Sequence, residues 1–192
     1  MSAPTRVAAL LDASVLVPAA LRDTLLRTAA AGLYTVWFSE MILEEVQRAL
    51  VSNELASATS AERLITNIRS HFWFALSQGY EPIASEMPNH PGDRHVLAAA
   101  IHANATIIVT ANLRHFPDAE LRPYGVSSMS PDSFLTMLLQ HDADAFISIV
   151  TQQAAALKSP PLSTHDVLAR LRIHAPTFVE RLSIMVDAVE RP

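Results

Sequence analysis

Residues 91–117, PGDRHVLAAAIHANATIIVTANLRHFP, hold a helix, a turn and a strand, and they decide the fold. Apolar residues recur at helical spacing after Asp93, so this acid stands at the leading end of an amphipathic helix. These apolar residues are Val96, Leu97, Ala100 and Ile101. The β-branched run TIIVT that follows predicts a short strand buried on both faces, as in the centre of a parallel sheet. Ligands bind just outside the carboxyl ends of such strands, so the polar residues after TIIVT are candidates for a site.

The rest of the chain alternates strands and helices. Strands are expected at residues 7–11, 34–38, 79–83, 106–110 and 125–129, with helices at 15–31, 39–51, 61–77 and 93–104 between them. This order predicts an α/β fold with a mainly parallel central sheet and helices on both faces. Beyond Phe134 the pattern is helical only, with helices expected at 131–140, 143–157, 164–173 and 176–189. We therefore expect an α/β domain over residues 1–140 and an all-helical C-terminal extension over 141–192.

Composition limits the possible functions. The chain has 192 residues and no cysteine, so it forms no disulfide framework and no thiolate metal site, which is compatible with a cytoplasmic protein. The formal net charge of −5 argues against a general polyanion binder, so an interaction with nucleic acid would need a local basic patch or a metal ion. No apolar run approaches the length of a membrane span, so no membrane association is expected.

Three acids stand out by their positions. Asp12 ends the first strand, Asp93 starts the helix before TIIVT, and Glu45 lies on the helix after the second strand. On that helix, Glu45 lies about 100° from the centre of the apolar face and Glu44 about 160°, so Glu45 is the better candidate for a half-buried site. Clustered carboxylates repel one another unless a cation joins them, and oxygen ligands are those that Mg²⁺ or Mn²⁺ prefers. A helix N-cap is the competing interpretation of Asp12.

Several motifs together resemble one family. LLDASVLVPA, SEMILEEVQRAL, DRHVLAAAI, IIVTANLRHFP and YGVSSMSPDSFL are similar to successive motifs of PIN-domain ribonucleases. The subgroup resembled is the VapC-type toxins of bacterial toxin–antitoxin pairs that carry an added C-terminal helical segment. The resemblance covers about residues 5–140. It implies a PIN-like α/β/α sandwich and a Mg²⁺- or Mn²⁺-dependent endoribonuclease.

The resemblance also assigns roles to residues. Asp12, Glu45 and Asp93 match the metal-binding acids of the family, and Asn112 falls where relatives carry Asp or Asn. Ser14 and Thr110 match small hydroxyl residues that support the site.

Two residues depart from the family pattern. Relatives often carry Asp where this chain has His90 in HPGD, and commonly Asp where it has His115 in NLRHFP. His115 could act as a metal ligand, a phosphate contact or a proton carrier, and an exposed loop histidine is an equally good interpretation. For His95 we expect a structural role.

The predicted mechanism is hydrolysis of single-stranded or looped RNA, with Arg114 or Arg69 contacting backbone phosphates. The resemblance further implies a cognate antitoxin and a homodimer. Two alternatives stay open. One is a catalytically weakened PIN module that binds RNA or protein, which the two histidines favour. The other is an ordinary α/β regulatory domain in which Asp12 and Asp93 are helix caps.

Overall fold

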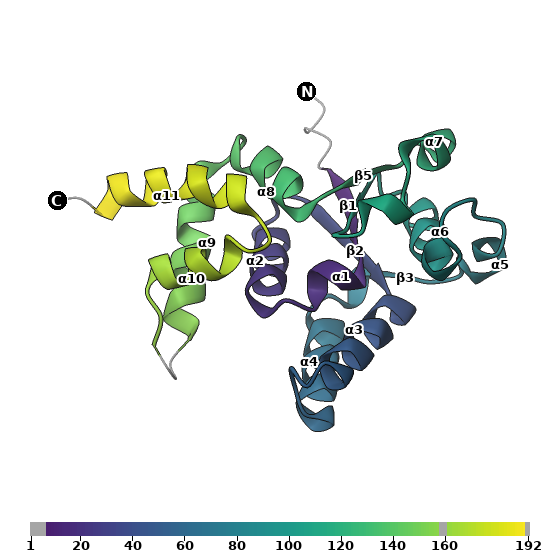
Figure 1. The fold of residues 1–192 in the computed structure, drawn as a ribbon, viewed down its shortest axis with the longest axis horizontal. Helices are drawn as coiled ribbons and strands as arrows, with labels where there is room; N and C mark the ends of the chain where they lie inside the picture. The colour runs from purple at the N-terminus through teal and green to yellow at the C-terminus, as the bar shows by residue number, and fades with distance from the viewer. Residues whose placement is uncertain (1–6, 158–160, 191–192) are drawn as a thin grey trace. The chain divides into compact units, whose positions relative to one another are not determined.

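Five short parallel strands form the central sheet in the order β3-β2-β1-β4-β5. The computed structural model describes residues 7–157 and 161–190. The strands are β1 (Ala8–Leu11), β2 (Thr35–Ser39), β3 (Leu76–Ser77), β4 (Ile107–Val109) and β5 (Ser127–Met129). Leu10 of β1 pairs with Trp37 on one side and Ile108 on the other, so β1 is central. The predicted parallel α/β architecture is confirmed (Figure 1).

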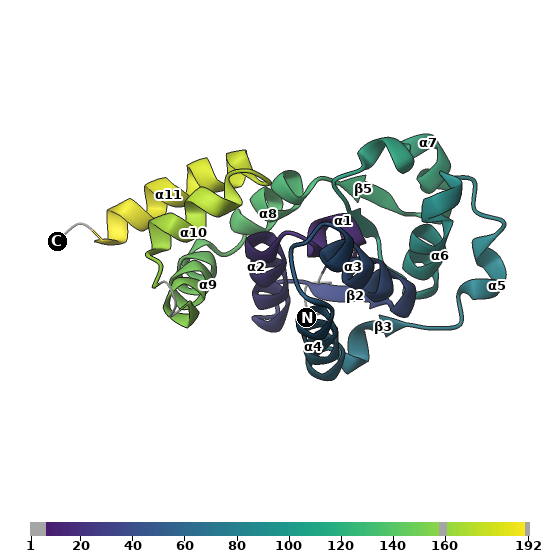
Figure 2. The same ribbon diagram turned by 60° about the horizontal axis from the view of Figure 1, so that its bottom comes forward.

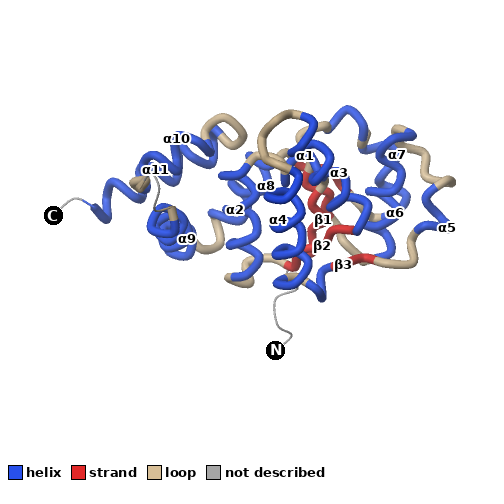
Figure 3. The backbone as a smooth tube through the Cα atoms, turned by 90° about the horizontal axis from the view of Figure 1, so that it is seen from below, coloured by secondary structure: helices blue, strands red, loops and turns tan. Residues whose placement is uncertain are grey.

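Helices cover both faces of this sheet. The chain moves from β1 to β2 to β3 in one direction, then returns across the sheet to β4. Because parallel crossovers are right-handed, the helices of the two directions lie on opposite faces. These are α3 (Glu40–Ser52) with α4 (Ala58–His71), and α6 (Arg94–His102). Figure 3 shows α4 and α6 on either side of the red strands. The short helices α1 (Ala13–Leu16), α5 (Glu81–Ala84) and α7 (Asp118–Leu121) complete this unit.

The fold contains two compact units. The first comprises residues 1–17 and 34–129, and the second comprises 18–33 and 130–192. The second unit is helical: α2 (Ala19–Ala30), α8 (Pro131–Leu139), α9 (Ala143–Ala156), α10 (Thr164–Leu171) and α11 (Pro176–Glu190). Figure 2 shows α9, α10 and α11 beside one another, and the edge-to-face pair of Phe146 and Phe178, 5.2 Å between centroids, joins α9 to α11. The division at residue 140 that the sequence suggests stays a prediction.

Local capping signals account for several helix starts. The Ile42 N–H donates to the Ser39 hydroxyl at the start of α3, and the Ser133 N–H donates to the Ser130 hydroxyl at the start of α8. Pro131 occupies the first turn of α8, where a missing N–H costs nothing. The four predicted C-terminal helices are confirmed within one or two residues at each end.

Three predicted elements are wrong. Residues 15–31 form two helices, α1 and α2, because Pro18 stands between them as the N-cap of α2 in an extended conformation. The helix expected at 61–77 ends at His71, and a 3₁₀ turn, η1 (Trp73–Ala75), leads into β3. The strand expected at 79–83 is instead β3, at Leu76–Ser77, since this edge strand has only two residues that pair with Phe38 and Ser39. Helix α5 starts at Glu81.

No helix within residues 7–157 and 161–190 has the length and apolar content to cross a membrane.

Candidate functional site

Asp12 is a buried acid held by two hydroxyl groups. It follows β1 directly and occupies the N-cap position of α1, yet its side chain makes no capping hydrogen bond. The hydroxyls of Ser14 and Thr110 donate to its Oδ2 atom at 2.6 and 2.8 Å. Asp12 is only 3% exposed, and Leu11 pairs with Val109, so the two neighbouring strands bring these groups together. The helix-cap interpretation of Asp12 is therefore wrong.

The loop after β4 continues this network. The Ala111 N–H donates to Ser14 Oγ at 3.0 Å, and the Asn112 N–H donates to Thr110 Oγ1 at 3.0 Å. The backbone of Asn112 thus belongs to the same set of hydrogen bonds as Asp12, and the Asn112 residue itself is exposed. Both hydroxyl residues that were expected to support the site, Ser14 and Thr110, contact Asp12.

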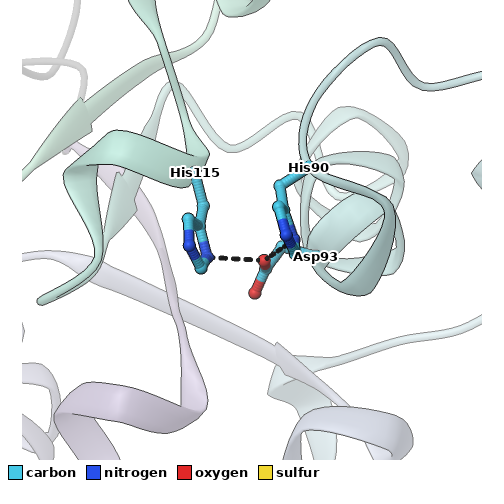
Figure 4. A group of neighbouring side chains, drawn as sticks. All are labelled: His90, Asp93 and His115. Carbon is cyan, nitrogen blue, oxygen red and sulfur yellow. Dashed lines mark hydrogen bonds and ion pairs between the residues drawn. The ribbon is translucent and has the colours of Figure 1, made fainter.

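Asp93 lies between two histidines. It ends the 3₁₀ turn η2 (Pro91–Asp93) at the N-cap position of α6, and its side chain makes no capping hydrogen bond either. Its Oδ2 atom lies 3.0 Å from His90 Nδ1 and 2.9 Å from His115 Nδ1 (Figure 4). His115 belongs to the 3₁₀ turn η3 (Leu113–His115), which follows β4. Potential ligand atoms of the three residues lie within 4.8 Å of one another, so this group could hold a metal ion.

Glu45 is half-buried and Glu44 is exposed, as the helical wheel predicts. Glu45 Oε2 lies 3.3 Å from Nε2 of His95, a buried residue on α6. This nitrogen has no aligned hydrogen-bond partner in the described part of the chain. Tyr80 lies in the same neighbourhood: burial raises the pKa of its phenol, a hydrogen bond with Ser39 opposes that shift, and the charge of Glu45 adds to it. Glu45 therefore reaches from α3 to α6, where it contacts a histidine two residues beyond Asp93.

The two predicted RNA-contacting arginines differ in their environment. Arg69 donates two hydrogen bonds to Glu40, at 2.9 and 2.7 Å, and this pairing raises the pKa of its guanidinium. Arg114 is exposed and donates from Nε to His115 Nε2 at 3.2 Å. Arg69 is therefore matched by a carboxylate, whereas Arg114 sits beside the histidine that contacts Asp93.

The loop of residues 110–115 links two of the three predicted acids. Thr110 contacts Asp12 and His115 contacts Asp93, so both acids are tied to the end of β4. Within the described residues, Asp12 and Glu45 do not share the 4.8 Å group that Asp93 forms with the two histidines. Sequence reasoning missed the contact of His95 with Glu45. The one local feature that could have drawn attention to His95 is its position two residues after Asp93.

Comparisons with known proteins agree with this architecture. The family model described as "PIN domain" matches residues 8–114, which contain β1 to β4 and all three acids. The chain belongs to the PIN domain family. The model described as "VapC50 C-terminal domain" matches residues 131–183, which correspond to α8, α9, α10 and about half of α11. The resemblance to VapC-type PIN proteins with a helical C-terminal segment is thus confirmed.

One curated protein is similar in sequence to a part of this chain. The chain is 38% identical over 107 residues to a protein of Mycobacterium tuberculosis (strain ATCC 25618 / H37Rv) named "Putative ribonuclease VapC50". The aligned region covers 56% of this chain and 63% of the relative. No solved structure matches the chain at a significant level.

Proposed function

We propose that this PIN-domain chain is a metal-dependent endoribonuclease that acts as the toxin of a type II toxin–antitoxin system. The observation that carries the proposal is the state of Asp12 and Asp93. Both occupy N-cap positions without capping a helix, and both contact residues of the loop at the end of β4. Acids that stand at strand ends and do not serve their helices are the expected ligands of a catalytic cation. The match to a protein named a ribonuclease supports the same activity.

The donor chemistry fits a divalent cation. Both hydroxyls donate to the same oxygen of Asp12, Oδ2, which orients the carboxylate and leaves Oδ1 to face an ion. Asp93 and Glu45 supply further hard oxygen donors, as Mg²⁺ or Mn²⁺ requires. Asp12, Glu45 and Asp93 would hold the ion, directly or through water, and Asn112 would assist them. When bound, such an ion activates water and stabilises the leaving oxygen in phosphodiester hydrolysis.

The other residues bind and orient the substrate. Arg114 is exposed beside His115, so its guanidinium is well placed to bind an RNA phosphate. Arg69 would have to exchange Glu40 for a phosphate, so we assign it the smaller contribution. Ser14 and Thr110 hold the Asp12 carboxylate against rotation. Single-stranded or looped RNA is the expected substrate because its bases are unstacked and its backbone is accessible. With a net charge of −5, the chain relies on these local positive charges to attract a polyanion.

The family implies further features that we include in the proposal: a cognate antitoxin, a homodimer, a cytoplasmic location, and an organisation into a nuclease domain of residues 1–140 and a helical extension of 141–192.

The decisive experiment is cleavage of a panel of structured RNAs, transfer RNA included, with Mg²⁺, Mn²⁺ or EDTA. The purified full chain is compared with Asp93→Asn. Cuts that need metal and vanish in the variant support the proposal and identify the substrate. If neither metal gives cleavage, while RNA still binds, the chain is a weakened PIN-fold binding module and the nuclease proposal fails.

A further inference from the structure

Three donor groups meet at one point beside η2. His90 and His115 both direct Nδ1 at the same oxygen of Asp93, Oδ2, at 3.0 and 2.9 Å (Figure 4). The two imidazole rings are stacked, with centroids 4.2 Å apart and an interplanar angle of 11°. Asp93 and His115 are mostly shielded from solvent, whereas the His90 side chain is 51% exposed. The group is therefore supported on one side and open on the other.

We propose that His90, Asp93 and His115 bind a divalent transition ion of the series from Mn²⁺ to Zn²⁺ in preference to Mg²⁺. This deepens the proposed function by naming the class of ion at Asp93, and it rests on that function only for the idea that the ion serves RNA cleavage. Imidazole nitrogen suits transition ions, whereas Mg²⁺ prefers carboxylates, carbonyls and water. Two nitrogens and one carboxylate oxygen thus form a donor set that discriminates against Mg²⁺.

The distances agree with a shared ion. Such ions bind nitrogen and oxygen donors at about 2.1 Å, so neighbouring donors around one ion lie about 3 Å apart. The two nitrogen–oxygen separations, 3.0 and 2.9 Å, are close to that value, which is also the length of a hydrogen bond. Asp93 has a second carboxylate oxygen, Oδ1, so ligation through Oδ2 is compatible with a separate ion shared with Asp12 and Glu45.

Hydrogen bonds alone do not account for both contacts of His90 Nδ1. Its Nδ1 atom accepts from the Gly92 N–H at 3.3 Å and also faces Asp93 Oδ2 at 3.0 Å. An imidazole nitrogen carries either a proton or a lone pair, so it cannot accept from Gly92 and donate to Asp93 at once. When Gly92 donates, a lone pair and a carboxylate oxygen face each other, and a cation between them would make that arrangement favourable.

The loop that carries His90 and Asp93 is held from behind. Asn89, which is 1% exposed, donates from Nδ2 to the Asp93 carbonyl at 3.1 Å. Arg94 donates to the carbonyls of Asn89 and Ser85 at 3.4 and 3.3 Å. These contacts fix the backbone on both sides of His90. Such outer contacts are what keep the ligands of a metal site in position.

Arg114 opposes ion binding in this arrangement. It donates to His115 Nε2, so the proton of that ring lies on Nδ1 and points at Asp93. An ion at Nδ1 needs the proton on Nε2 and therefore breaks the contact with Arg114. Removing the Arg114 side chain should strengthen transition-ion binding, and weaker binding in that variant would contradict this role for Arg114.

The test measures binding, not cleavage. The full chain is titrated with Mg²⁺, Mn²⁺, Co²⁺ and Zn²⁺ by calorimetry, and the visible spectrum of bound Co²⁺ reports nitrogen ligation. The test variant is His90→Asp with His115→Asp, which keeps the number of donors but removes both nitrogens. His90→Gln is the second variant, since its exposed side chain can be changed with little risk to folding. His141→Asn, at an exposed position between α8 and α9, is the matched control.

The expected result is Co²⁺ and Zn²⁺ binding at least about tenfold tighter than Mg²⁺ binding in the wild type. His90→Gln should weaken Co²⁺ by about tenfold or more, and the double variant should lose the preference and change the Co²⁺ spectrum. His141→Asn should match the wild type. Equal affinity for Co²⁺ and Mg²⁺, or a spectrum that the double variant leaves unchanged, overturns the proposal.

The two proposals can fail separately. Cleavage with Mg²⁺ and no nitrogen-ligated Co²⁺ would overturn the ion assignment and leave the nuclease function intact. Nitrogen-ligated Co²⁺ without cleavage by any metal would support this site and overturn the nuclease function.

Discussion

Each compact unit buries a polar side chain, Asp12 in the first and Gln153 in the second, and their partners differ. Asp12 is an acid whose Oδ2 atom accepts from two hydroxyls that come from separate segments of the chain. Gln153 accepts from the Thr24 hydroxyl at 2.8 Å and donates to the Ala20 carbonyl at 3.0 Å, joining α9 to α2. The Gln153 amide thus uses both of its polar ends for packing. The Asp12 carboxylate has oxygen capacity beyond its two hydroxyl contacts.

Burial of a polar group therefore does not by itself indicate a site. In the helical unit the buried pair is neutral and mutually satisfied, and it needs nothing from outside. In the sheet unit the buried group is ionisable and lies at the carboxyl end of the central strand. We expect substitutions at Asp12 to affect chemistry and those at Gln153 to affect stability, and the predictions below separate these outcomes.

The largest effect is expected for Asp12→Asn. The substitution keeps the size and one oxygen that can accept from the two hydroxyls, but it replaces the other oxygen with an NH2 donor and removes the charge that would hold a cation. RNA cleavage at saturating metal should fall by about a hundredfold or more, with the circular dichroism spectrum unchanged. Asp144→Asn, on the exposed side of α9, is the matched control and should cleave like the wild type. Full metal-dependent cleavage by Asp12→Asn would remove this residue from the site.

The two arginines should differ in their contribution to RNA binding. Arg114→Ala should raise KM about tenfold and lower the salt dependence of binding, because an exposed phosphate contact is lost. Arg69→Ala should change KM by less than about threefold, since Glu40 already pairs with this guanidinium. Both constants are measured with a short fluorescent RNA at several salt concentrations. A larger effect at Arg69 would reverse the assignment and move the RNA path toward α4.

The fold was predictable where its signals are local. Ser39, Ser130 and Pro131 mark helix starts within a few residues, and the run TIIVT contains the three residues of β4. Strand β3 was not predicted, because a strand of two residues is too short to show a periodic pattern. The sequence pattern also predicted one helix in place of α1 and α2. Pro18 is acceptable both within the first turn of a helix and as a break between two helices.

The candidate site likewise has residues that local sequence predicts and contacts that only the tertiary fold creates. Asp12 and Asp93 were visible because each directly follows a strand or starts a helix, and the inward position of Glu45 followed from its helical face. The contact of His95 with Glu45 depends on the tertiary fold that brings these side chains of α6 and α3 together, which no local spacing encodes. The meeting of His90 with His115 is likewise tertiary: 25 residues separate them, and only the return of the chain through β4 brings η3 to η2.

A double-mutant cycle on Gln153 and Thr24 tests the expectation that this buried pair serves stability and not chemistry. Gln153→Leu should lower the free energy of unfolding by about 1 to 2 kcal/mol, because two hydrogen bonds of the buried amide are lost and the Thr24 hydroxyl keeps only the Ala20 carbonyl as an acceptor. Combining it with Thr24→Val should restore part of that loss, since both polar partners are then gone. Urea unfolding gives the values, and cleavage by the folded variants should be unchanged. Reduced cleavage with unchanged stability would show that Gln153 is more than a packing residue.

The smallest effect is expected at an exposed cap of the helical unit. The hydroxyl and backbone N–H of Ser163 donate to Asp166, and these hydrogen bonds hold the pKa of its carboxyl below the usual value. The folded state therefore favours the ionised form, so this stabilisation is present above the unfolded pKa of about 3.9 and is lost as the pH falls through the lower folded pKa. At pH 7, Asp166→Asn should melt slightly below the wild type, and the gap should close as the pH falls below about 4. Melting curves across that range measure it, with Asp144→Asn as the uncapped control. A gap that persists at low pH would mean that the substitution acts through the geometry of the cap and not through its charge.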